Sequence, residues 1–155
     1  MAEYQTAIIV DAPLEDVYNQ WTQFEEFPRF MDGVLQVHQI DDKRLSWRAR
    51  IGGIEKEWEA VITDQTPNRR IAWKSTTGAR NAGTVLFERV PEGTHVTLKL
   101  VYDPVGTTEN VGDALGFVTR RVLGDLRRFR QFIEDREHAT GAWRGEIHGQ
   151  EVHRG

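Results

Sequence analysis

Three acidic side chains, Glu55, Glu57 and Glu59, stand at alternate positions of a strand-like run. Alternate residues of a β-strand lie on one face, so these carboxylates would be neighbours, as paired carboxylates are in acid–base catalysis. The preceding run carries Arg48 and Arg50 with the same alternation. An antiparallel hairpin would set an arginine opposite two of the three glutamates, and such cross-strand pairs are favourable. We therefore interpret these carboxylates as the exposed face of a hairpin rather than as an active site.

The hairpin itself is predicted by Gly52–Gly53, a two-residue turn signal between two alternating runs. With this turn, Arg50 faces Glu55 on one side of the hairpin and Trp47 faces Trp58 on the other. A slip of one residue would put both tryptophans in water, so the register is well specified. A sheet with an aromatic face needs another apolar element to cover it.

A long helix predicted over residues 110–137 supplies that cover. Its apolar residues recur at steps of three and four, which is the helical period: Val111, Leu115, Val118, Val122, Leu126, Phe129 and Ile133. Between Thr107 and His138, six arginines are matched by six acidic residues. We therefore interpret the arginines as a solvated face rather than as a patch for an acidic partner.

Seven strands and two short helices precede the long helix. Alternation and turn residues predict the following order: a strand at 3–10, helices at about 13–21 and 24–31, and strands at 34–40, 44–51, 54–66, 70–76, 83–90 and 95–102. We divide the chain into a domain over residues 1–138 and a Gly-rich tail over 139–155 that is expected to be largely flexible. Trp143 and Ile147 are the exceptions, since they could dock on the body of the protein or on a neighbouring molecule.

The composition is that of one soluble domain of 155 residues with a net charge of −4, which argues against a nucleic-acid partner. No apolar run is long enough to span a membrane, and the N-terminal residues do not form a signal peptide. The chain has no cysteine, so disulfides and Cys-based zinc sites are excluded. These features predict a cytoplasmic protein, with oligomeric state undetermined and transient membrane contact left open.

Other site chemistries find little support in the sequence. The five histidines show no metal-ligand spacing within an ordered element: His38, His95, His138, His148 and His153. The last two lie in the tail, where binding of a stray transition metal stays an alternative. No Gly-rich phosphate loop and no readable Ser/His/Asp arrangement is present. We expect no metal site and no cofactor.

The last two strands extend the apolar face. We expect Phe87 to lie beside Leu98 and Val85 beside Leu100, because a register shifted by one residue would mix apolar and polar residues on both faces. Trp73 shares this face through the preceding strand.

Several runs resemble the polyketide cyclase/dehydrase branch of the START-like superfamily, over roughly residues 3–137. They are Phe27-Pro-Arg-Phe-Met-Asp-Gly-Val, Ile71-Ala-Trp-Lys-Ser, Gly78-Ala-Arg-Asn-Ala-Gly-Thr-Val-Leu-Phe, Val96-Thr-Leu-Lys-Leu, Gly112-Asp-Ala-Leu-Gly and Asp125-Leu-Arg-Arg-Phe. The resemblance implies an α+β helix-grip fold. In this fold a curved seven-stranded antiparallel sheet wraps around a long C-terminal helix, with two short helices between strands 1 and 2 and a hydrophobic cavity inside.

The resemblance and the apolar face lead to one main functional hypothesis, the binding or carriage of a hydrophobic small molecule that is lipid, quinone or polyketide-like. A polyketide cyclase/dehydratase acting in the same cavity is the alternative, and a module that binds a protein partner is a third. The cavity is expected to have a volume of roughly 300–1,000 Å³. Its candidate ligand-binding residues are Phe30, Trp47, Trp58, Trp73, Ser75, Arg80, Asn81, Phe87, Leu98, Leu100, Tyr102, Val118 and Val122.

No catalytic residue can be assigned by a one-to-one motif match. The polar candidates are Ser75, Arg80, Asn81 and Tyr102, and each also has a structural interpretation: Asn81 as a turn residue, Arg80 as a surface residue, and Tyr102 as a rim tyrosine whose hydroxyl reaches water. We expect at most one of Arg80, Asn81 and Tyr102 to face the cavity.

Overall fold

The computed structural model describes residues 2–51, 53–78, 80–102 and 111–154. Its elements, in chain order, are β1 (Ala2–Val10), α1 (Leu14–Trp21), the short 3-10 helix η1 (Phe24–Arg29), β2 (Val34–Gln39), β3 (Arg44–Ile51), β4 (Ile54–Thr66), β5 (Arg70–Gly78), β6 (Asn81–Val90), β7 (Gly93–Tyr102), α2 (Val111–Arg136), β8 (Glu146–His148) and β9 (Glu151–His153). The expected element order from β1 to α2 is present.

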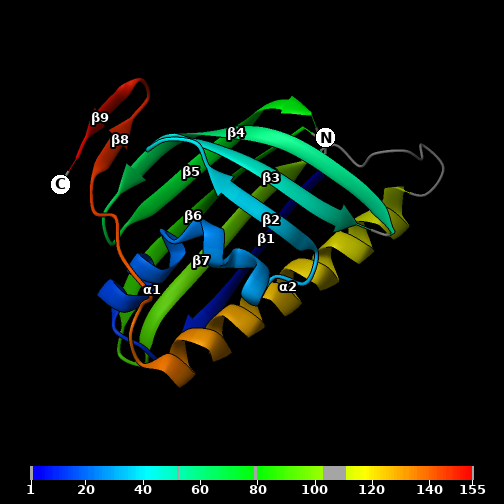
Figure 1. The fold of residues 1–155 in the computed structure, drawn as a ribbon. Coiled ribbons are helices and arrows are strands. Elements are labelled where there is room, and N and C mark those ends of the chain that lie inside the picture. Colours follow the sequence, from blue (N-terminus) through cyan, green and yellow to red (C-terminus); the bar gives the residue numbers. More distant parts are fainter. Residues whose placement is uncertain (1, 52, 79, 103–110, 155) are drawn as a thin grey trace.

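The main sheet is antiparallel, with strand order β1-β7-β6-β5-β4-β3-β2. Figure 1 shows this sheet curling around α2, with α1 and η1 beside the C-terminal half of that helix. The described part of the chain contains nine strands rather than the seven expected. The two additional strands form because β4 extends beyond the end of β3, which leaves an unpaired edge that β8 fills at Asp64 and Gln65.

The register of the β3–β4 hairpin is the predicted one. Trp47 is the partner of Trp58, and their rings stack with centroids 5.7 Å apart and an interplanar angle of 7°. Arg48 is the partner of Glu57 along the backbone, but its guanidinium lies 3.3 Å from the carboxylate of Glu55 instead. The ion pair on the charged face therefore runs diagonally between the two strands. The side chains of Arg48 and Glu55 are each about half exposed.

The β6–β7 register differs from the expectation by two residues. Val85 pairs with Leu98, and Phe87 pairs with Val96. The strands run up to a tight turn in which Val90 pairs with Gly93, and Gly93 adopts φ +134°, a conformation that favours glycine. A shift of two residues preserves which side chains share a face, so the predicted apolar face is correct.

The interior between sheet and helix is filled with aromatic rings near α1 and η1. Phe129 of α2 is completely buried and meets Trp21 of α1 with ring centroids 4.8 Å apart. Phe30 contacts Phe129 at 5.4 Å, and Phe27 contacts Phe30 at 5.7 Å. Such ring pairs stabilise beyond their buried area. We call this region the packed end of the molecule.

The loop after η1 is held to α2 by one ionic cluster. Asp125 is largely buried, forms an ion pair with Arg128 and accepts a hydrogen bond from the backbone N–H of Asp32 at 3.2 Å. Arg128 also donates from Nε to the carbonyl oxygen of Phe30 at 2.9 Å. Burial of the Asp125 carboxyl raises its pKa, and the attraction of Arg128 offsets this only in part.

The expectation of a largely flexible tail is wrong for residues 139–154. This segment, which we call the strap, crosses the packed end from α2 to the edge of β4 (Figure 1). Ile147 is completely buried and Trp143 packs against the core, in agreement with their assignment as docking residues. Their partners are Thr22, directly after α1, and Gln65 in β4, both more than 70 residues earlier in the sequence.

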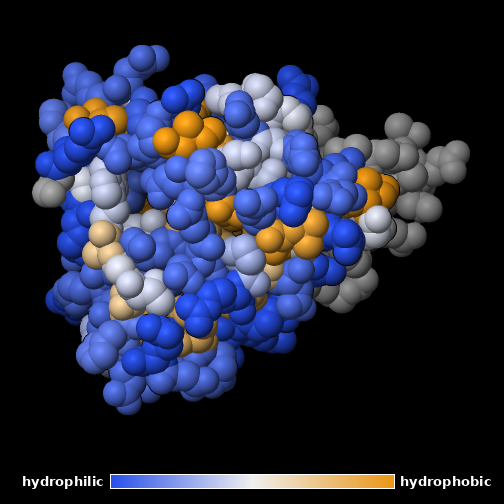
Figure 2. All heavy atoms as spheres, in the orientation of Figure 1, coloured by the Kyte–Doolittle hydropathy of each residue, from blue (hydrophilic) through white to orange (hydrophobic). Residues whose placement is uncertain are grey.

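The molecular surface in Figure 2 shows hydrophobic residues scattered among hydrophilic ones, with no single large apolar patch on this face. Among the described residues, the exposed large apolar side chains are Ile9 in β1, Ile40 just after β2 and Ile54 in β4, so they do not form one group in the sequence. No helix in the described ranges is long and apolar enough to cross a membrane.

Candidate functional site

The sequence candidates Trp73, Ser75 and Asn81 meet on the inner face of the sheet, at the end opposite the packed end. The Trp73 Nε1–H donates to Asn81 Oδ1 at 3.2 Å, and the Asn81 backbone N–H donates to Ser75 Oγ at 3.0 Å. These bonds link β5 to the start of β6 across their connection. Asn81 is therefore a member of an inner polar network rather than only a turn residue.

The Trp73 ring lies across the backbone of β6. A Cβ placed on Gly83 would be only 2.3 Å from a ring carbon of Trp73, so a larger residue at position 83 would displace the indole. Gly83 is the backbone partner of both Trp73 and Leu100. Trp73 and Leu100 are each only partly buried. The absence of a side chain at Gly83 thus lets the flat ring of Trp73 lie on the inner face of the sheet, and this face stays only partly covered.

Tyr102 lies next to this surface, opposite Asn81 in the β6–β7 ladder. Its side chain is 8% exposed, and its hydroxyl group is buried with no hydrogen-bond partner among the described residues. Burial raises the pKa of this hydroxyl above its usual value, so it stays protonated at neutral pH. The expectation of a rim tyrosine whose hydroxyl reaches water is therefore wrong. A buried donor without a partner costs about 1–3 kcal/mol.

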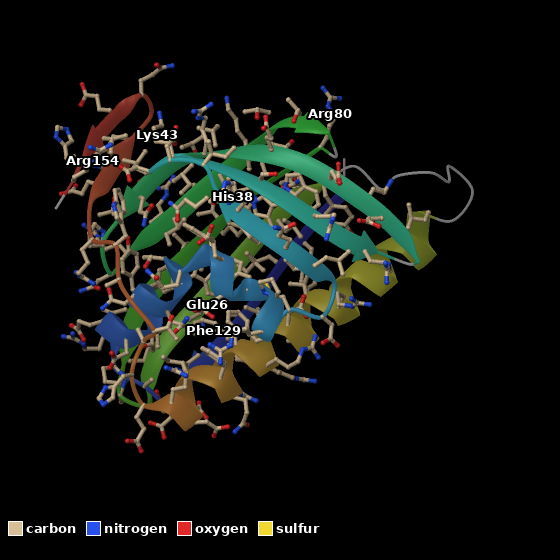
Figure 3. All side chains as sticks on the ribbon, in the orientation of Figure 1. Glu26, His38, Lys43, Arg80, Phe129 and Arg154 are labelled. Carbon is tan, nitrogen blue, oxygen red and sulfur yellow. The ribbon has the colours of Figure 1, made fainter. Side chains whose placement is uncertain are left out.

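Arg80 does not join this group. It is exposed, and Figure 3 shows its side chain projecting outward from the β5–β6 connection. Asn81 and Tyr102 both lie on the inner face, so two of the three polar candidates face inward where at most one was expected. The reason is alternation: Asn81 and Tyr102 are direct partners on one face, so the sheet orients them together.

The stacked pair Trp47–Trp58 extends the aromatic inner face across β3 and β4. Both rings are partly buried, and Trp47 also meets Phe27 at 5.7 Å. The Nε1–H of Trp47 is buried and has no hydrogen-bond partner among the described residues. Trp58 is the backbone partner of Gly78, at the end of β5 that leads to Asn81. The stack therefore connects the packed end to the region around Trp73.

The other candidates divide between the packed end and the rest of the interior. Phe30 and Phe87 are buried in the aromatic cluster, where Phe87 meets Tyr18 at 5.3 Å. Leu98 is buried, and Val122 is partly buried against the same cluster. Val118 lies outside the side chains that the structure describes. The region with partly buried surface and unpartnered polar groups is therefore the one around Trp58, Trp73, Leu100 and Tyr102, which we call the open end.

Two grooves on the outer face of the sheet were not anticipated from the sequence. One, of about 460 Å³, is lined by Asp64, Thr66, Arg69, Arg70, Leu86, Phe87, Glu88, His95 and Thr97. The other, of about 630 Å³, is lined by Gln36, His38, Ser46, Trp47, Arg48, Glu57, Trp58, Glu59 and Thr77. Both are open and are lined mainly by polar residue types, as expected for long side chains on the solvated side of a curled sheet. Within the described part of the chain, no three acidic or histidine residues are arranged to hold a metal ion.

A sheet that curls around a long helix, with an aromatic inner face, is also found in known proteins. The family model described as polyketide cyclase / dehydrase and lipid transport matches residues 10–130. The chain belongs to this family. An uncharacterized 17.2 kDa protein of Streptomyces lincolnensis is 45% identical over 149 residues, covering 95% of this chain and 99% of the relative.

Solved structures of START-like proteins share the fold. A START superfamily protein from Mycobacterium smegmatis is similar with a TM-score of 0.76 at 12% identity, covering 86% of this chain and 97% of that one. The Zhui aromatase/cyclase from Streptomyces sp. R1128 is similar with a TM-score of 0.72 at 15% identity, covering 91% of this chain and 98% of that one. At these identities the likeness concerns the fold. The START-like, helix-grip assignment made from the sequence is thereby confirmed.

Proposed function

We propose that this protein binds or carries a hydrophobic small molecule of the lipid, quinone or polyketide-like class, between the sheet and α2 at the open end. The observation that carries this proposal is the buried, unpartnered hydroxyl of Tyr102 beside the partly buried rings of Trp58 and Trp73. An apolar surface with a few convergent polar groups is typical of small-molecule sites. Membership of a family that includes lipid transport proteins supports the same class of ligand.

The chemistry of these groups defines the ligand more closely. The hydroxyl of Tyr102 is protonated at neutral pH and needs an acceptor, and the indole surfaces favour flat apolar rings. A ring system with a carbonyl oxygen would satisfy the hydroxyl and cover the rings together. For a carrier, transient contact with a membrane would load and release such a molecule.

A cyclase or dehydratase acting at the same place is the second candidate function. It is favoured by the position of Tyr102 beside the network of Ser75 and Asn81, and by the fold shared with an aromatase/cyclase. Because its pKa is raised, Tyr102 would serve as a hydrogen-bond or proton donor rather than as a base. Asn81 and Ser75 would orient the substrate, since neither titrates near neutral pH.

The test of the binding proposal uses Tyr102→Phe with two probes, menadione and naphthalene. Menadione carries carbonyl acceptors on a fused ring and naphthalene carries none, and the absence of cysteine removes the thiol reaction of the quinone. We expect the variant to bind menadione about tenfold more weakly, the effect of one hydrogen bond, and naphthalene equally well. Thermal stability should be equal or higher, because the buried hydroxyl has no partner to lose and its unsatisfied burial is itself costly.

Equal affinity of wild type and Tyr102→Phe for menadione would contradict the assignment of this hydroxyl. Native mass spectrometry of the protein from its own host, followed by extraction, then separates the two functions. A retained compound released unchanged after incubation supports a carrier, and conversion to a dehydrated or cyclised product supports the enzyme.

A further inference from the structure

The indole of Trp47 carries a buried donor on the inner face of the sheet, in addition to the hydroxyl of Tyr102. Its Nε1–H is buried and has no hydrogen-bond partner among the described residues. Trp73, on the same face, shows the usual arrangement, because its Nε1–H donates to Asn81 Oδ1 at 3.2 Å. Buried polar groups are hydrogen-bonded in nearly all proteins. The donor of Trp47 therefore needs an acceptor that the described part of the chain does not supply.

Two aromatic neighbours hold this donor in position. The Trp47 ring stacks on Trp58 with an interplanar angle of 7°, and Phe27 meets it with ring centroids 5.7 Å apart. Rings packed in this way keep one rotamer, so the N–H cannot turn toward another acceptor. A donor that is already fixed before a ligand arrives loses little freedom on binding. Trp47 thus has the properties of a preorganised ligand contact.

The inner face of the sheet supplies donors rather than acceptors. Within the described strands β3 to β7, the registers put no aspartate, glutamate or histidine on this face. Lys56, which alternation places on the same face as Trp58, can only donate. The Oγ of Ser75 already accepts from the backbone N–H of Asn81, so its own proton is available to donate. A ligand at the open end must therefore bring the acceptors.

Trp47 and Tyr102 are widely separated on this face. Trp47 belongs to β3 and Tyr102 to β7, with three strands between them. Four steps between neighbouring strands correspond to about 19 Å along the sheet, and the curl of the sheet around α2 shortens this span (Figure 1). The two carbonyl oxygens of menadione lie across one ring and are too close together to reach both donors. A ligand that satisfies both carries its oxygens at opposite ends of a longer ring system.

We propose that Trp47 Nε1–H and Tyr102 Oη–H are two anchors of one site, which selects an elongated, flat and apolar molecule with an acceptor oxygen at each end, such as a fused-ring diketone. This proposal rests on the proposed function, because it adds a second anchor to the same site. It also narrows the ligand class. A lipid with polar atoms at one end only would meet one anchor and leave the other buried donor unsatisfied.

Three naphthalenes that differ only in their number of acetyl groups test the two anchors: 2,6-diacetylnaphthalene, 2-acetylnaphthalene and naphthalene. In equilibrium dialysis, we expect the wild type to bind the diacetyl compound about tenfold more tightly than the monoacetyl compound, the effect of one additional hydrogen bond. In Trp47→Phe this preference should fall to at most about twofold, the statistical advantage of a symmetric ligand. The variant should still prefer 2-acetylnaphthalene to naphthalene, because Tyr102 remains. A wild type without the preference for the diacetyl compound would overturn the proposal.

Trp58→Phe is the matched control. It removes the same part of an indole ring from the same stack, but the Nε1–H of Trp58 is not one of the buried groups without a partner. This variant should keep the tenfold preference for the diacetyl compound. Retention of the preference in Trp47→Phe, or its equal loss in both variants, would contradict the role of the Trp47 N–H.

The Nε1–H resonance of Trp47 reports the contact directly. The chain has five tryptophans, and the indole signal that is absent from the spectrum of Trp47→Phe is that of Trp47. Saturation with 2,6-diacetylnaphthalene should shift this signal downfield, as a new hydrogen bond does, and naphthalene should not. An unchanged signal would mean that an ordered water satisfies the indole, and the second anchor would not exist.

These measurements separate the second anchor from the proposed function. If Tyr102→Phe weakens menadione about tenfold while Trp47→Phe keeps the preference for the diacetyl compound, the site exists and Trp47 is not part of it. If Tyr102→Phe leaves menadione unchanged and none of the three naphthalenes binds the wild type, the site itself is assigned wrongly.

Discussion

The two ends of the interior share one sheet face but differ in how completely that face is covered. At the packed end, Phe129 is fully buried among the rings of α1 and η1, and the strap closes the edge of β4. At the open end, Trp58, Trp73 and Leu100 are only partly buried, although they follow the same alternation of inward side chains. Alternation therefore determines direction, and the covering elements determine burial.

The same difference predicts which substitutions should lower the stability of the fold and which should weaken ligand binding. Contacts between side chains at the packed end are already complete, so substitutions there remove packing energy. The aromatic surface of the open end is incompletely covered by the described residues, so substitutions there should affect a ligand more than the fold. The predictions below test this division.

The largest effect is expected for Phe129→Ala at the packed end. Phe129 is 0% exposed and contacts both Trp21 and Phe30. Truncation of a buried aromatic ring leaves a cavity and should lower the free energy of unfolding by about 3–5 kcal/mol in a urea titration. The matched control is Phe132→Ala on the same helix, where the partly exposed ring lies between Arg29 and Arg136. If Phe132→Ala were as unstable as Phe129→Ala, the distinction between the fully buried ring and the partly exposed ring would be contradicted.

Trp58→Ala tests the open end. The ring stacks on Trp47 but is only partly buried, so we expect a stability loss of at most about 3 kcal/mol, at the low end for aromatic truncations. Binding of menadione should weaken strongly. The control is Glu57→Ala on the exposed face, where Arg48 pairs with Glu55 instead, so the loss should be at most about 1 kcal/mol, the upper value for a surface ion pair. Thermal melts with probe titration measure both, and a larger loss in the control would reverse the assignment of the two faces.

The β3–β4 hairpin shows how much of the fold the sequence predicts. The Gly52–Gly53 turn and the two-faced pattern gave the register of Trp47 and Trp58 correctly because only one register separates charge from aromatic surface. The β6–β7 hairpin was predicted with the correct faces but a register shifted by two residues. Alternation has a period of two, so it cannot distinguish these registers, and the length of the turn before Gly93 decides between them.

The strap could not be predicted because its sequence has little periodicity. Trp143 and Ile147 are fixed by α1 and by the unpaired edge of β4, and that edge exists only because β4 is longer than β3. For the candidate site, alternation correctly placed Trp73, Ser75 and Tyr102 on one face. It could not show that the Tyr102 hydroxyl is sealed from water, since burial depends on elements distant in the sequence.

Asp125 provides a smaller test of the packed end. Burial outweighs the attraction of Arg128 and raises the pKa of this carboxyl, so its stabilising contribution is complete below pH 3.8 and is lost as the pH rises through the raised pKa. At pH 7, Asp125→Asn should therefore stay within about 1 kcal/mol of the wild type, because the amide oxygen can still accept from Asp32 N–H. Asp125→Ala removes that acceptor and should cost about 1–3 kcal/mol. Equal losses in the two variants by urea titration would show that the charge itself holds the loop.

The smallest effect concerns Tyr18 and appears only in alkaline solution. Burial raises its pKa from 10.0 to about 12, so the folded protein holds the phenolic proton more tightly than the unfolded chain does. This contribution to stability is complete below about pH 10 and is lost as the pH rises from 10 to 12. At neutral pH, Tyr18→Phe should be at least as stable as the wild type, because the hydroxyl has no well-aligned partner to lose. At pH 11 the variant should be the more stable protein by about 1 kcal/mol, since it has no proton to release on unfolding.

Urea titrations at pH 8 and pH 11 measure the difference, with Tyr102→Phe as the control for the less strongly shifted tyrosine at the open end. A Tyr18→Phe variant that is clearly less stable at pH 8 would mean that the hydroxyl is satisfied in the folded protein, and the strap-covered end would then be as complete in its hydrogen bonds as it is in its packing.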